Sequence, residues 1–232
     1  MTIEIFASSS DGNCSYIEKP STNIIIDCGL KIQDMKRCLN HSLSSIDGCL
    51  ISHSHKDHCK SAKHLLQHGV NIYCTRETAD EIGIQGHRVR IIEPSKSFSL
   101  KDWTIKPFKL KHDVMNVGFL MQYKNEEKGI YITDTPYTSY KFPALDFIII
   151  ECNYVLKDFD QSNINSYLKK RIISNHMSME SLVKMLKNNN LSRLKEIHLI
   201  HLSSTNSHEN KIKSEIQSIT GIPVYVAKEK VT

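Results

Sequence analysis

The sequence predicts an α+β fold in which two β-sheets pack face to face and helices cover both outer faces, a four-layer αββα sandwich. Three observations predict it: short β-rich segments fill the first part of the chain, helices interleave with strands and hairpins, and the last third alternates strand and helix. The chain has 232 residues without repeats, low-complexity tracts or a linker rich in Pro, Gly and Ser. We therefore expect one domain over residues 1–232.

The expected strands are short runs of β-branched and apolar residues bounded by turn residues. They are Thr2–Phe6, Ser15–Glu18, Asn23–Asp27, Gly48–Ser52, Val70–Cys74, Arg88–Ile92, Trp103–Leu110, Val117–Tyr123, Gly129–Thr133, Asp146–Glu151, Glu196–His201 and Pro223–Ala227.

Four helices are predicted from apolar residues at helical spacing and from capping residues. They are Lys31–Leu39, Ser61–His68, Ser178–Asn188 and Glu209–Ile219. Ser61 and Ser178 are expected to cap the starts of two of them, and Gly69 and Gly221 follow the ends of two. A fifth helix is expected over Gln161–Ile173.

The composition points to a protein without a membrane span. The longest apolar runs, such as Phe147–Ile150, fall far short of the ~18–20 residues that a span needs. No basic region followed by an apolar stretch opens the chain, so we expect no signal peptide. The seven cysteines are odd in number and form no CxxC, which favours reduced thiols and a cytoplasmic location. The net charge of +5 fits an anionic substrate, but it fits a lysine-rich solvated surface equally well.

Residues 53–58 carry the clearest chemical signal, because four of these six positions hold His53, His55, Asp57 and His58. Imidazole and carboxylate are the nitrogen and oxygen donors that zinc prefers. An extended stretch would place the first three on one side, and the last would turn in as the chain bends into a helix. The alternative is a polar loop that happens to be rich in histidine, in a chain with 12 histidines. The spacing favours a metal site.

The H-x-H-x-D-H pattern of residues 53–58 resembles the signature of the metallo-β-lactamase superfamily, which has the αββα sandwich fold. The resemblance implies further ligands in a fixed order, and His112, Asp134 and His201 match that order. Taken alone, the first would be a surface histidine and the second an ordinary turn aspartate. Strand alternation sends His198 to the face opposite His201, so only one of the two can point inward, and we choose His201.

The resemblance also implies two divalent metal ions, with zinc expected and manganese also suited to the ligands, and a bridging water or hydroxide. Metal one would be bound by His53, His55, His112 and Asp134, and metal two by Asp57, His58, His201 and Asp134. Asp57 would thus belong to the catalytic machinery as well. Two aspartates and a hydroxide cancel three of four positive charges, and the remaining charge suits a phosphate oxyanion.

More of the chain resembles small bacterial and phage members of the superfamily, which are exonuclease-like or phosphodiesterase-like. The segments that carry this resemblance are Ala7–Cys14, Ile150–Asn153, Tyr167–Ser178, and His201–Ser203 followed by Asn206. Two departures concern the pocket: Tyr154-Val155 replaces a His-Asp pair, and Asn175 stands where those members have glycine.

His176 and Glu151 are expected to act beside the metal ligands. In related phosphodiesterases a histidine at the place of His176 contacts the phosphate or protonates the leaving oxygen, and an alkoxide leaves poorly without a proton. The alternatives are an exposed histidine near a helix start, or a ligand in place of His201. Glu151 would orient a ligand or His176, or it would be a plain strand-end residue.

A nuclease is the first choice of function, because Lys169, Lys170 and Arg171 lie just before His176, where they could contact phosphates. A second basic cluster, between residues 101 and 111, is better explained as a solvated face, and no stacking platform of aromatic and basic residues is evident. The main alternative is a phosphodiesterase for small or cyclic nucleotides, because the chain lacks room for a nucleic-acid clamp. A third hypothesis is a non-catalytic, metal-stabilised binding protein. Members of the superfamily are often dimers, so a homodimer is also expected.

Overall fold

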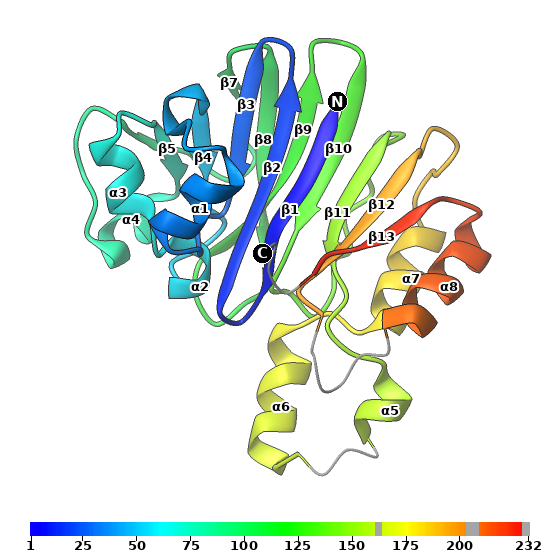
Figure 1. Cartoon of the computed structure of the whole chain (residues 1–232). Coiled ribbons are helices and arrows are strands. Elements are labelled where there is room, and N and C mark those ends of the chain that lie inside the picture. The colour runs from blue at the N-terminus through cyan, green and yellow to red at the C-terminus, as the bar shows by residue number, and fades with distance from the viewer. Residues whose placement is uncertain (161–163, 203–208, 229–232) are drawn as a thin grey trace. The chain divides into compact units, whose positions relative to one another are not determined.

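The computed structural model describes residues 1–160, 164–202 and 209–228 (Figure 1). Contacts group the chain into two compact units. Unit 1 comprises residues 1–109, 114–117 and the C-terminal residues from 228, and unit 2 comprises residues 110–113 and 118–227. Each unit is described by itself.

Unit 1 is built on a six-stranded sheet with the order β1-β2-β3-β4-β5-β6. The strands are β1 Thr2–Ser9, β2 Gly12–Lys19, β3 Thr22–Ile26, β4 Gly48–Leu50, β5 Ile72–Cys74 and β6 Val89–Ile91. The first three form an antiparallel meander, and the strands from β3 to β6 pair in parallel. Parallel pairing requires crossover connections, and helices supply them here.

The helices of unit 1 are α1 Ile32–Cys38, α2 Lys56–Cys59, α3 Ala62–Gln67 and α4 Arg76–Ile82, with a short 3-10 turn at Leu43–Ser45. Figure 1 shows them gathered beside β3, β4 and β5. Met35, Leu65 and Ala79 are buried with Cys49 and Ile72 in one hydrophobic core. The hairpin of β7 Phe98–Leu100 and β8 Trp103–Leu110 also belongs to this unit, except for the last residue of β8.

Unit 2 contains strands in the order β13-β12-β11-β10-β9. They are β9 Asn116–Tyr123, of which the first two residues group with unit 1, β10 Glu127–Ile132, β11 Phe147–Glu151, β12 Glu196–Ile200 and β13 Val224–Val226. The pair β9–β10 is antiparallel, and the strands from β10 to β13 are parallel. The carboxyl ends of β10, β11 and β12 therefore meet at one edge of the sheet, where a site can form.

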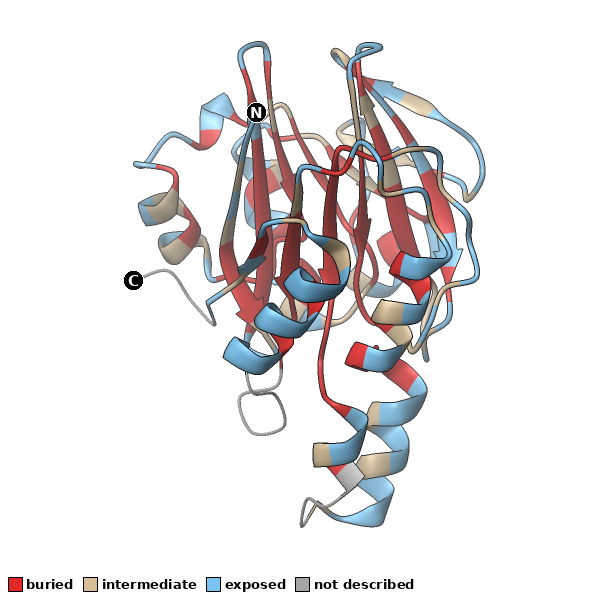
Figure 2. Ribbon diagram, turned by 90° about the vertical axis from the view of Figure 1, so that its right-hand side faces the viewer, coloured by how far each residue is buried: buried red, intermediate tan, exposed pale blue. Residues whose placement is uncertain are grey.

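The helices of unit 2 are α5 Leu156–Asp160, α6 Ser166–Asn175, α7 Met179–Lys187 and α8 Glu209–Thr220. Every residue of β11 is buried, as expected for a parallel strand with both faces covered. Figure 2 shows the strands almost entirely in the colour of buried residues and the helices with exposed outer sides. Helix α8 contacts both α7 and β13.

Every expected strand overlaps an observed strand. Among the described residues, four helices and strands and the 3-10 turn at Leu43–Ser45 were not predicted. The four are β7, α2, α4 and α5. Helix α4 has only a few apolar residues to give a periodic signal, and local capping defines it instead: Thr75 accepts a hydrogen bond from the Thr78 N–H, and Gly83 ends it at φ +64.

Two details of the predicted helices were wrong. The helix expected over residues 161–173 runs from Ser166 to Asn175, because the Asn165 side chain accepts from the Tyr167 N–H and sets the start. Gln161 lies outside the described residues. Ser61 precedes α3, but its hydroxyl donates to the Leu30 carbonyl at 2.6 Å and makes no capping bond. Ser178 caps α7 as predicted.

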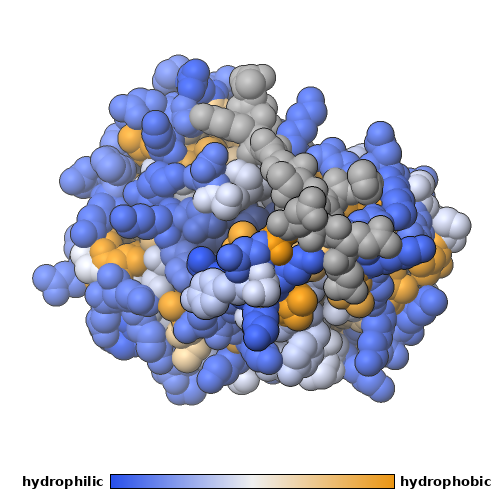
Figure 3. Space-filling view, turned by 90° about the horizontal axis from the view of Figure 1, so that it is seen from below, coloured by the Kyte–Doolittle hydropathy of each residue, from blue (hydrophilic) through white to orange (hydrophobic). Residues whose placement is uncertain are grey.

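None of the helices within the described ranges is long and apolar enough to cross a bilayer. The face shown in Figure 3 is hydrophilic over most of its area, with hydrophobic side chains in separate groups.

Candidate metal centre

The segment of His53 to His58 leaves the sheet of unit 1 and turns into a helix. After β4 the chain bends at Ser54, and His55 (φ −60°, ψ 141°) is extended directly before α2. The His58 N–H donates to the His55 carbonyl at 2.9 Å, so Asp57 lies in the first turn of α2. The prediction that strand alternation aims Asp57 was therefore wrong, because the helix directs this side chain.

The four side chains of this segment gather in unit 1. The rings of His53 and His58 are 4.1 Å apart between centroids, and those of His53 and His55 are 4.8 Å apart. His58 Nε2 lies 3.3 Å from Asp57 Oδ2. His53 and His58 are fully buried, and the Asp57 side chain remains partly open to solvent. His53 is thus close to both other imidazoles, and the Asp57 carboxylate is close to His58.

Asp27 was not assigned to the site from the sequence, but its carboxylate holds Ser52 and the His58 ring of this first cluster in place. It follows β3 with a left-handed φ of +59° and is fully buried. Its carboxylate accepts from the Ser52 N–H at 2.8 Å and from the Ser52 hydroxyl at 2.9 Å, and its Oδ2 lies 2.8 Å from His58 Nδ1. With Nδ1 donating to Asp27, His58 keeps the Nε2 lone pair for a metal. The sequence did contain a signal for Asp27, because this aspartate directly follows three isoleucines and is therefore expected to be buried. Buried aspartates are rare unless a partner such as His58 pairs with them.

Asn13 of the first hairpin and Gly29, in the segment after β3, lie against the same cluster. The Asn13 amide nitrogen lies 3.0 Å from His58 Nε2 and 3.3 Å from Asp57 Oδ2. A Cβ on Gly29 would stand 1.6 Å from the Asp57 carbonyl oxygen. Only glycine allows this approach of backbone to backbone. The segment Ala7–Cys14, which carries part of the resemblance, thus reaches the site through Asn13.

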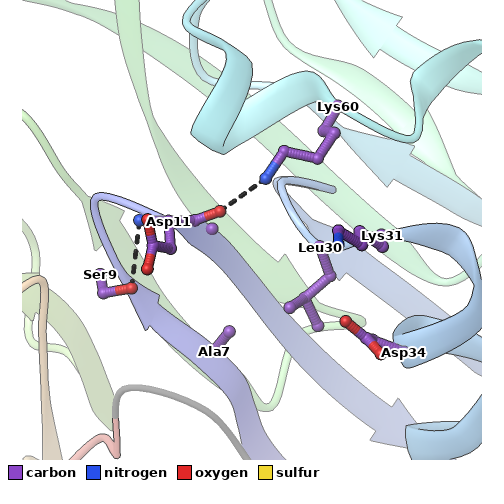
Figure 4. A pocket seen from close by; sticks show the side chains of 8 residues that line it. Ala7, Ser9, Asp11, Leu30, Lys31, Asp34 and Lys60 are labelled. Carbon is purple, nitrogen blue, oxygen red and sulfur yellow. Dashed lines mark hydrogen bonds between the residues drawn. The ribbon is translucent and has the colours of Figure 1, made fainter.

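A cavity of about 390 Å³ opens in unit 1 next to this hairpin (Figure 4). It is lined by Ala7, Ser9, Asp11, Gly12, Leu30, Lys31, Asp34 and Lys60. The Lys60 ammonium crosses it to donate to the Asp11 carbonyl at 2.6 Å. Two lysines and two aspartates balance each other here, so its charge favours neither anion nor cation.

A second cluster forms at the sheet edge of unit 2. One of its residues follows β10, one is the last residue of β11, one follows β12, and one ends α6. Its members are Asp134, Glu151, His176 and His201, and one ligand atom of each lies within 4.8 Å of the others. The sequence therefore named all four, although for different roles.

Both histidines of this cluster face the same two carboxylates. His176 Nδ1 lies 2.6 Å from Glu151 Oε1 and 3.0 Å from Asp134 Oδ1. His201 Nδ1 lies 2.9 Å from Asp134 Oδ1 and 3.2 Å from Glu151 Oε1. The site thus pairs two acids with two bases in a buried setting.

The charges of this cluster shift the pKa values of its members. Burial alone would lower the pKa of each histidine, but the carboxylates outweigh it. Glu151 and Asp134 together raise the pKa of His176 to about 10, and Asp134 with Glu151 raises that of His201 to about 9. Burial would raise the pKa of Glu151, but the positive charge and hydrogen bond of His176 keep it below its usual value. Without a cation, protons on the histidines neutralise the carboxylates.

Glu151 and Asn153 tie together the segments that carry the two histidines. The second oxygen of Glu151 accepts from the N–H groups of Thr135 at 3.2 Å and Met177 at 3.3 Å. The Asn153 amide donates to the His201 carbonyl at 2.8 Å. Sequence reasoning quoted Asn153 only as part of a motif and gave it no role.

Asp134 and His201 both adopt left-handed backbone, with φ of +51° and +55°. Such conformations are uncommon outside glycine, and Asp and His adopt them more readily than most residues. They turn the chain sharply at a strand end and aim the side chain across the sheet edge. Their occurrence at two cluster residues is typical of a functional site.

His112 and His198 lie in different surroundings. The side chain of His112 is almost buried, its Nε2 is 3.1 Å from Asp113 Oδ1, and its ring centroid lies 6.3 Å from that of His176. His198 instead stacks on Tyr225 and approaches Glu196 at 3.0 Å. The structure therefore brings His112 to the side of the second cluster and engages His198 elsewhere. Ser203 and Asn206 of the last motif lie outside the described residues.

The donor sets fit a divalent metal of borderline softness. Imidazole nitrogens and carboxylate oxygens are ligands of zinc and manganese. The second cluster offers two carboxylates whose charges need a cation or protons, and the first offers a histidine held in the tautomer that ligates.

Sequence comparisons agree with this chemistry. A family model described as the β-lactamase superfamily domain matches residues 22–199. Exodeoxyribonuclease WalJ of Streptococcus pneumoniae is 27% identical over 95% of this chain and 90% of its own length. Exodeoxyribonuclease YycJ of Bacillus anthracis is 22% identical over 93% of this chain and 87% of its own.

Solved structures show the same fold. The metallo-β-lactamase fold protein YhfI of Bacillus subtilis matches with a TM-score of 0.77 at 17% identity, over 99% of this chain and 97% of its own. The short form of human tRNase Z matches with a TM-score of 0.69 at 16% identity, over 100% of this chain and 98% of its own. These likenesses confirm the predicted α+β sandwich. The chain therefore belongs to the metallo-β-lactamase superfamily and is a metal-dependent hydrolase.

Proposed function

We propose that this protein is a nuclease that cleaves phosphodiester bonds in DNA with two divalent metal ions, zinc in the first place and manganese as an alternative. The observation that carries the proposal is the hydrogen-bonded pair of His176 and Glu151 beside Asp134 and His201. The pair offers a proton donor next to metal-ligating groups, as phosphodiester cleavage requires. The two relatives named exodeoxyribonucleases support DNA as the substrate.

The proposed ligands are those that the superfamily motifs indicate. They are His53, His55, Asp57, His58, His112, Asp134 and His201. The metal ions would supply an activated water and positive charge for the phosphate oxygens. Asp27 and Asn13 would hold Asp57 and His58 in place, and Glu151 would hold His176.

His176 is proposed as the acid that protonates the leaving oxygen. Its Nδ1 is engaged by Glu151, which leaves Nε2 for the substrate. Its side chain is 22% exposed, whereas those of Asp134 and Glu151 are 4% and 0% exposed, so a phosphate can reach it. The alternative is that His176 itself ligates a metal, because its Nδ1 lies as near to Asp134 as that of His201 does.

The substitution His176→Ala distinguishes these two roles. If the residue is the acid, turnover falls about 10²–10⁴-fold while the bound metal, measured by elemental analysis, stays at the wild-type level. Loss of metal together with turnover would assign the residue as a ligand instead. His198→Ala is the matched control, because it removes a histidine of the same unit that is engaged by Glu196 and Tyr225.

The competing substrate class is small or cyclic nucleotides. Turnover of bis(p-nitrophenyl) phosphate with Mn²⁺ or Zn²⁺ tests for a phosphodiesterase, and single- and double-stranded DNA, RNA and cyclic nucleotides are then compared side by side. The proposal expects degradation of DNA. Hydrolysis of cyclic nucleotides alone would contradict it.

Two further expectations stay predictions. A cytoplasmic location is supported by the seven cysteines, because the structure pairs none of them in a disulfide. A homodimer would be detected as a doubled mass in light scattering.

A further inference from the structure

Helix α6 presents an unusual outer face for a helix that ends in the candidate site. It runs from Ser166 to Asn175, and His176 is the residue that ends it. Tyr167 is 77% exposed, the largest value among the exposed large hydrophobic side chains of the described residues. A tyrosine this exposed, on a helix that ends in the candidate site, suggests that a bound molecule covers it.

The exposed face of α6 combines this tyrosine with cations. Tyr167, Lys170, Arg171 and Ser174 are spaced three or four residues apart, so at about 100° per residue they share one side of the helix. All four are exposed, the opposite side carries the half-buried Ile172, and the buried Asn175 lies at the edge next to Arg171. We call these four residues the α6 face.

The charge of the helix has one sign. Lys169, Lys170 and Arg171 are its only charged residues. Lys169 turns inward, with its ammonium 5.8 Å from the centre of the Phe159 ring. Lys170 and Arg171 remain in solvent on the α6 face, which therefore attracts anions.

The last turn of α6 connects this face firmly to His176. The His176 N–H donates to the Ile172 carbonyl at 2.8 Å, and the Asn175 amide donates to the Arg171 carbonyl at 3.1 Å. Ten helical residues span about 15 Å. A stacked strand advances roughly 3.4 Å per phosphate, so the helix matches about four phosphates.

We propose that the α6 face binds the single-stranded end of a DNA substrate and leads it to His176. Tyr167 stacks on an unpaired base, and Lys170 and Arg171, about one turn nearer to His176, contact the phosphates between that base and the site. The proposal rests on the nuclease function proposed above and adds the surface that a polymer, unlike a cyclic nucleotide, would use.

A lipid surface is the competing partner for an exposed basic helix, and the arrangement of α6 argues against it. Membrane-bound helices bury one continuous apolar face. Here the exposed apolar residues Leu168 and Ile173 lie about 140° apart on the side away from the α6 face, and Lys169 stands between them, so the helix exposes no continuous apolar face.

The cations are tested with the double variant Lys170→Ala/Arg171→Ala in the metal-loaded protein. Binding of a fluorescein-labelled, phosphorothioate-linked single strand, which resists cleavage, is measured by anisotropy over a range of salt. The variant should bind at least tenfold more weakly, and its salt slope should fall by about 1.4, because two phosphate contacts contribute roughly 0.7 each. Lys187→Ala/Lys213→Ala is the control, since it removes the same charge from exposed positions of α7 and α8 in the same unit.

The tyrosine is tested with Tyr167→Ala and Tyr167→Phe. Loss of stacking should weaken binding roughly tenfold in the first variant, and the second, which keeps the ring, should restore it. Tyr225→Ala, which removes another exposed tyrosine of unit 2, should leave binding unchanged. Alanine favours the helical conformation, so the α6 variants that introduce alanine should stay folded, and thermal melting checks this.

Three outcomes would overturn the proposal, and they differ in whether they also contradict the proposed nuclease function. Equal binding by the α6 variants and their controls would refute the role of the α6 face in binding DNA, but it would not contradict the nuclease function. A wild-type protein that neither binds nor degrades any single strand would contradict both. Sedimentation with vesicles rich in anionic lipid, lost in the Lys170→Ala/Arg171→Ala variant, together with unchanged DNA binding, would assign the face to a membrane surface.

Discussion

Asp27 links two parts of the first cluster through one buried carboxylate. It accepts from Ser52, whose hydroxyl lies 2.9 Å from His53 Nδ1, and it faces Nδ1 of His58. One acid thus fixes the ring orientation of two predicted ligands. Residues of this kind govern metal affinity without touching the metal.

The substitution Asp27→Asn keeps the shape of this side chain but replaces one acceptor with a donor. His58 would then have to present its Nδ1 lone pair to the amide and carry its proton on Nε2, which opposes ligation. We expect metal affinity to fall about 10–100-fold, measured by competition with a chromophoric chelator. Asp47→Asn is the control, because Asp47 in the same unit pairs with Lys101 and the Asn23 N–H. Unchanged affinity in Asp27→Asn would refute this role.

The raised pKa values of His176 and His201 predict how the metal-free protein responds to pH. Their folded values of about 10 and 9 exceed the usual 6.5. The stabilisation that they provide is therefore complete below pH 6.5 and is lost as the pH rises through the folded values. Urea unfolding of the chelated protein should show the free energy of unfolding falling over this range, and less so for His176→Gln. Superimposable profiles would contradict the pairing with Glu151 and Asp134.

The residues of the site divide into those that sequence could name and those that it could not. The local spacing of residues 53–58 was enough to identify the ligand candidates there. The order of residues along the chain identified four more: His112, Asp134, His176 and His201. Asp27 and Asn13 act on His58 from 31 and 45 positions away. Such contacts exist only after folding, and no local pattern in the sequence encodes them.

At the scale of elements, the site residues sit where strands end. Asp27 follows β3, Asp134 follows β10 by one further residue, Glu151 closes β11, and His201 follows β12. Parallel strands make this possible, because their carboxyl ends share an edge and their connections leave it. Strand positions were predictable from apolar runs, whereas β7 and α2 were too short, and α4 had too few apolar residues, to give a period.

Gly29 tests the packing of the segment after β3 against α2. In Gly29→Ala the new methyl group would overlap the Asp57 carbonyl, so the backbone must move. We expect about 1–3 kcal/mol lower stability in denaturant unfolding and weaker metal binding, because Asp57 moves with its backbone.

Gly86→Ala provides the contrast for this change. Gly86 has open space around its Cα but a φ of +116°, so alanine there is strained without touching the site. It should cost stability and leave metal affinity at the wild-type value. Equal metal affinity in both variants would show that the approach of Gly29 to Asp57 is irrelevant to binding.

At the scale of the whole chain, the order of elements and the H-x-H-x-D-H motif sufficed to predict the fold class and the superfamily, and the comparisons confirm both. The substrate could not be predicted in the same way. It depends on surfaces such as the α6 face, where Tyr167 and Arg171 come together through helical spacing and exposure that only the folded chain defines.

The proposed nuclease cuts a DNA strand at a centre that needs divalent metal. This dependence is measured by titrating Mn²⁺ or Zn²⁺ into chelated protein and following the shortening of an end-labelled single strand. We expect no degradation without metal and a rise to a plateau at about two ions per chain. Degradation that persists under chelation, or a fully loaded protein that leaves every DNA strand intact, would contradict it.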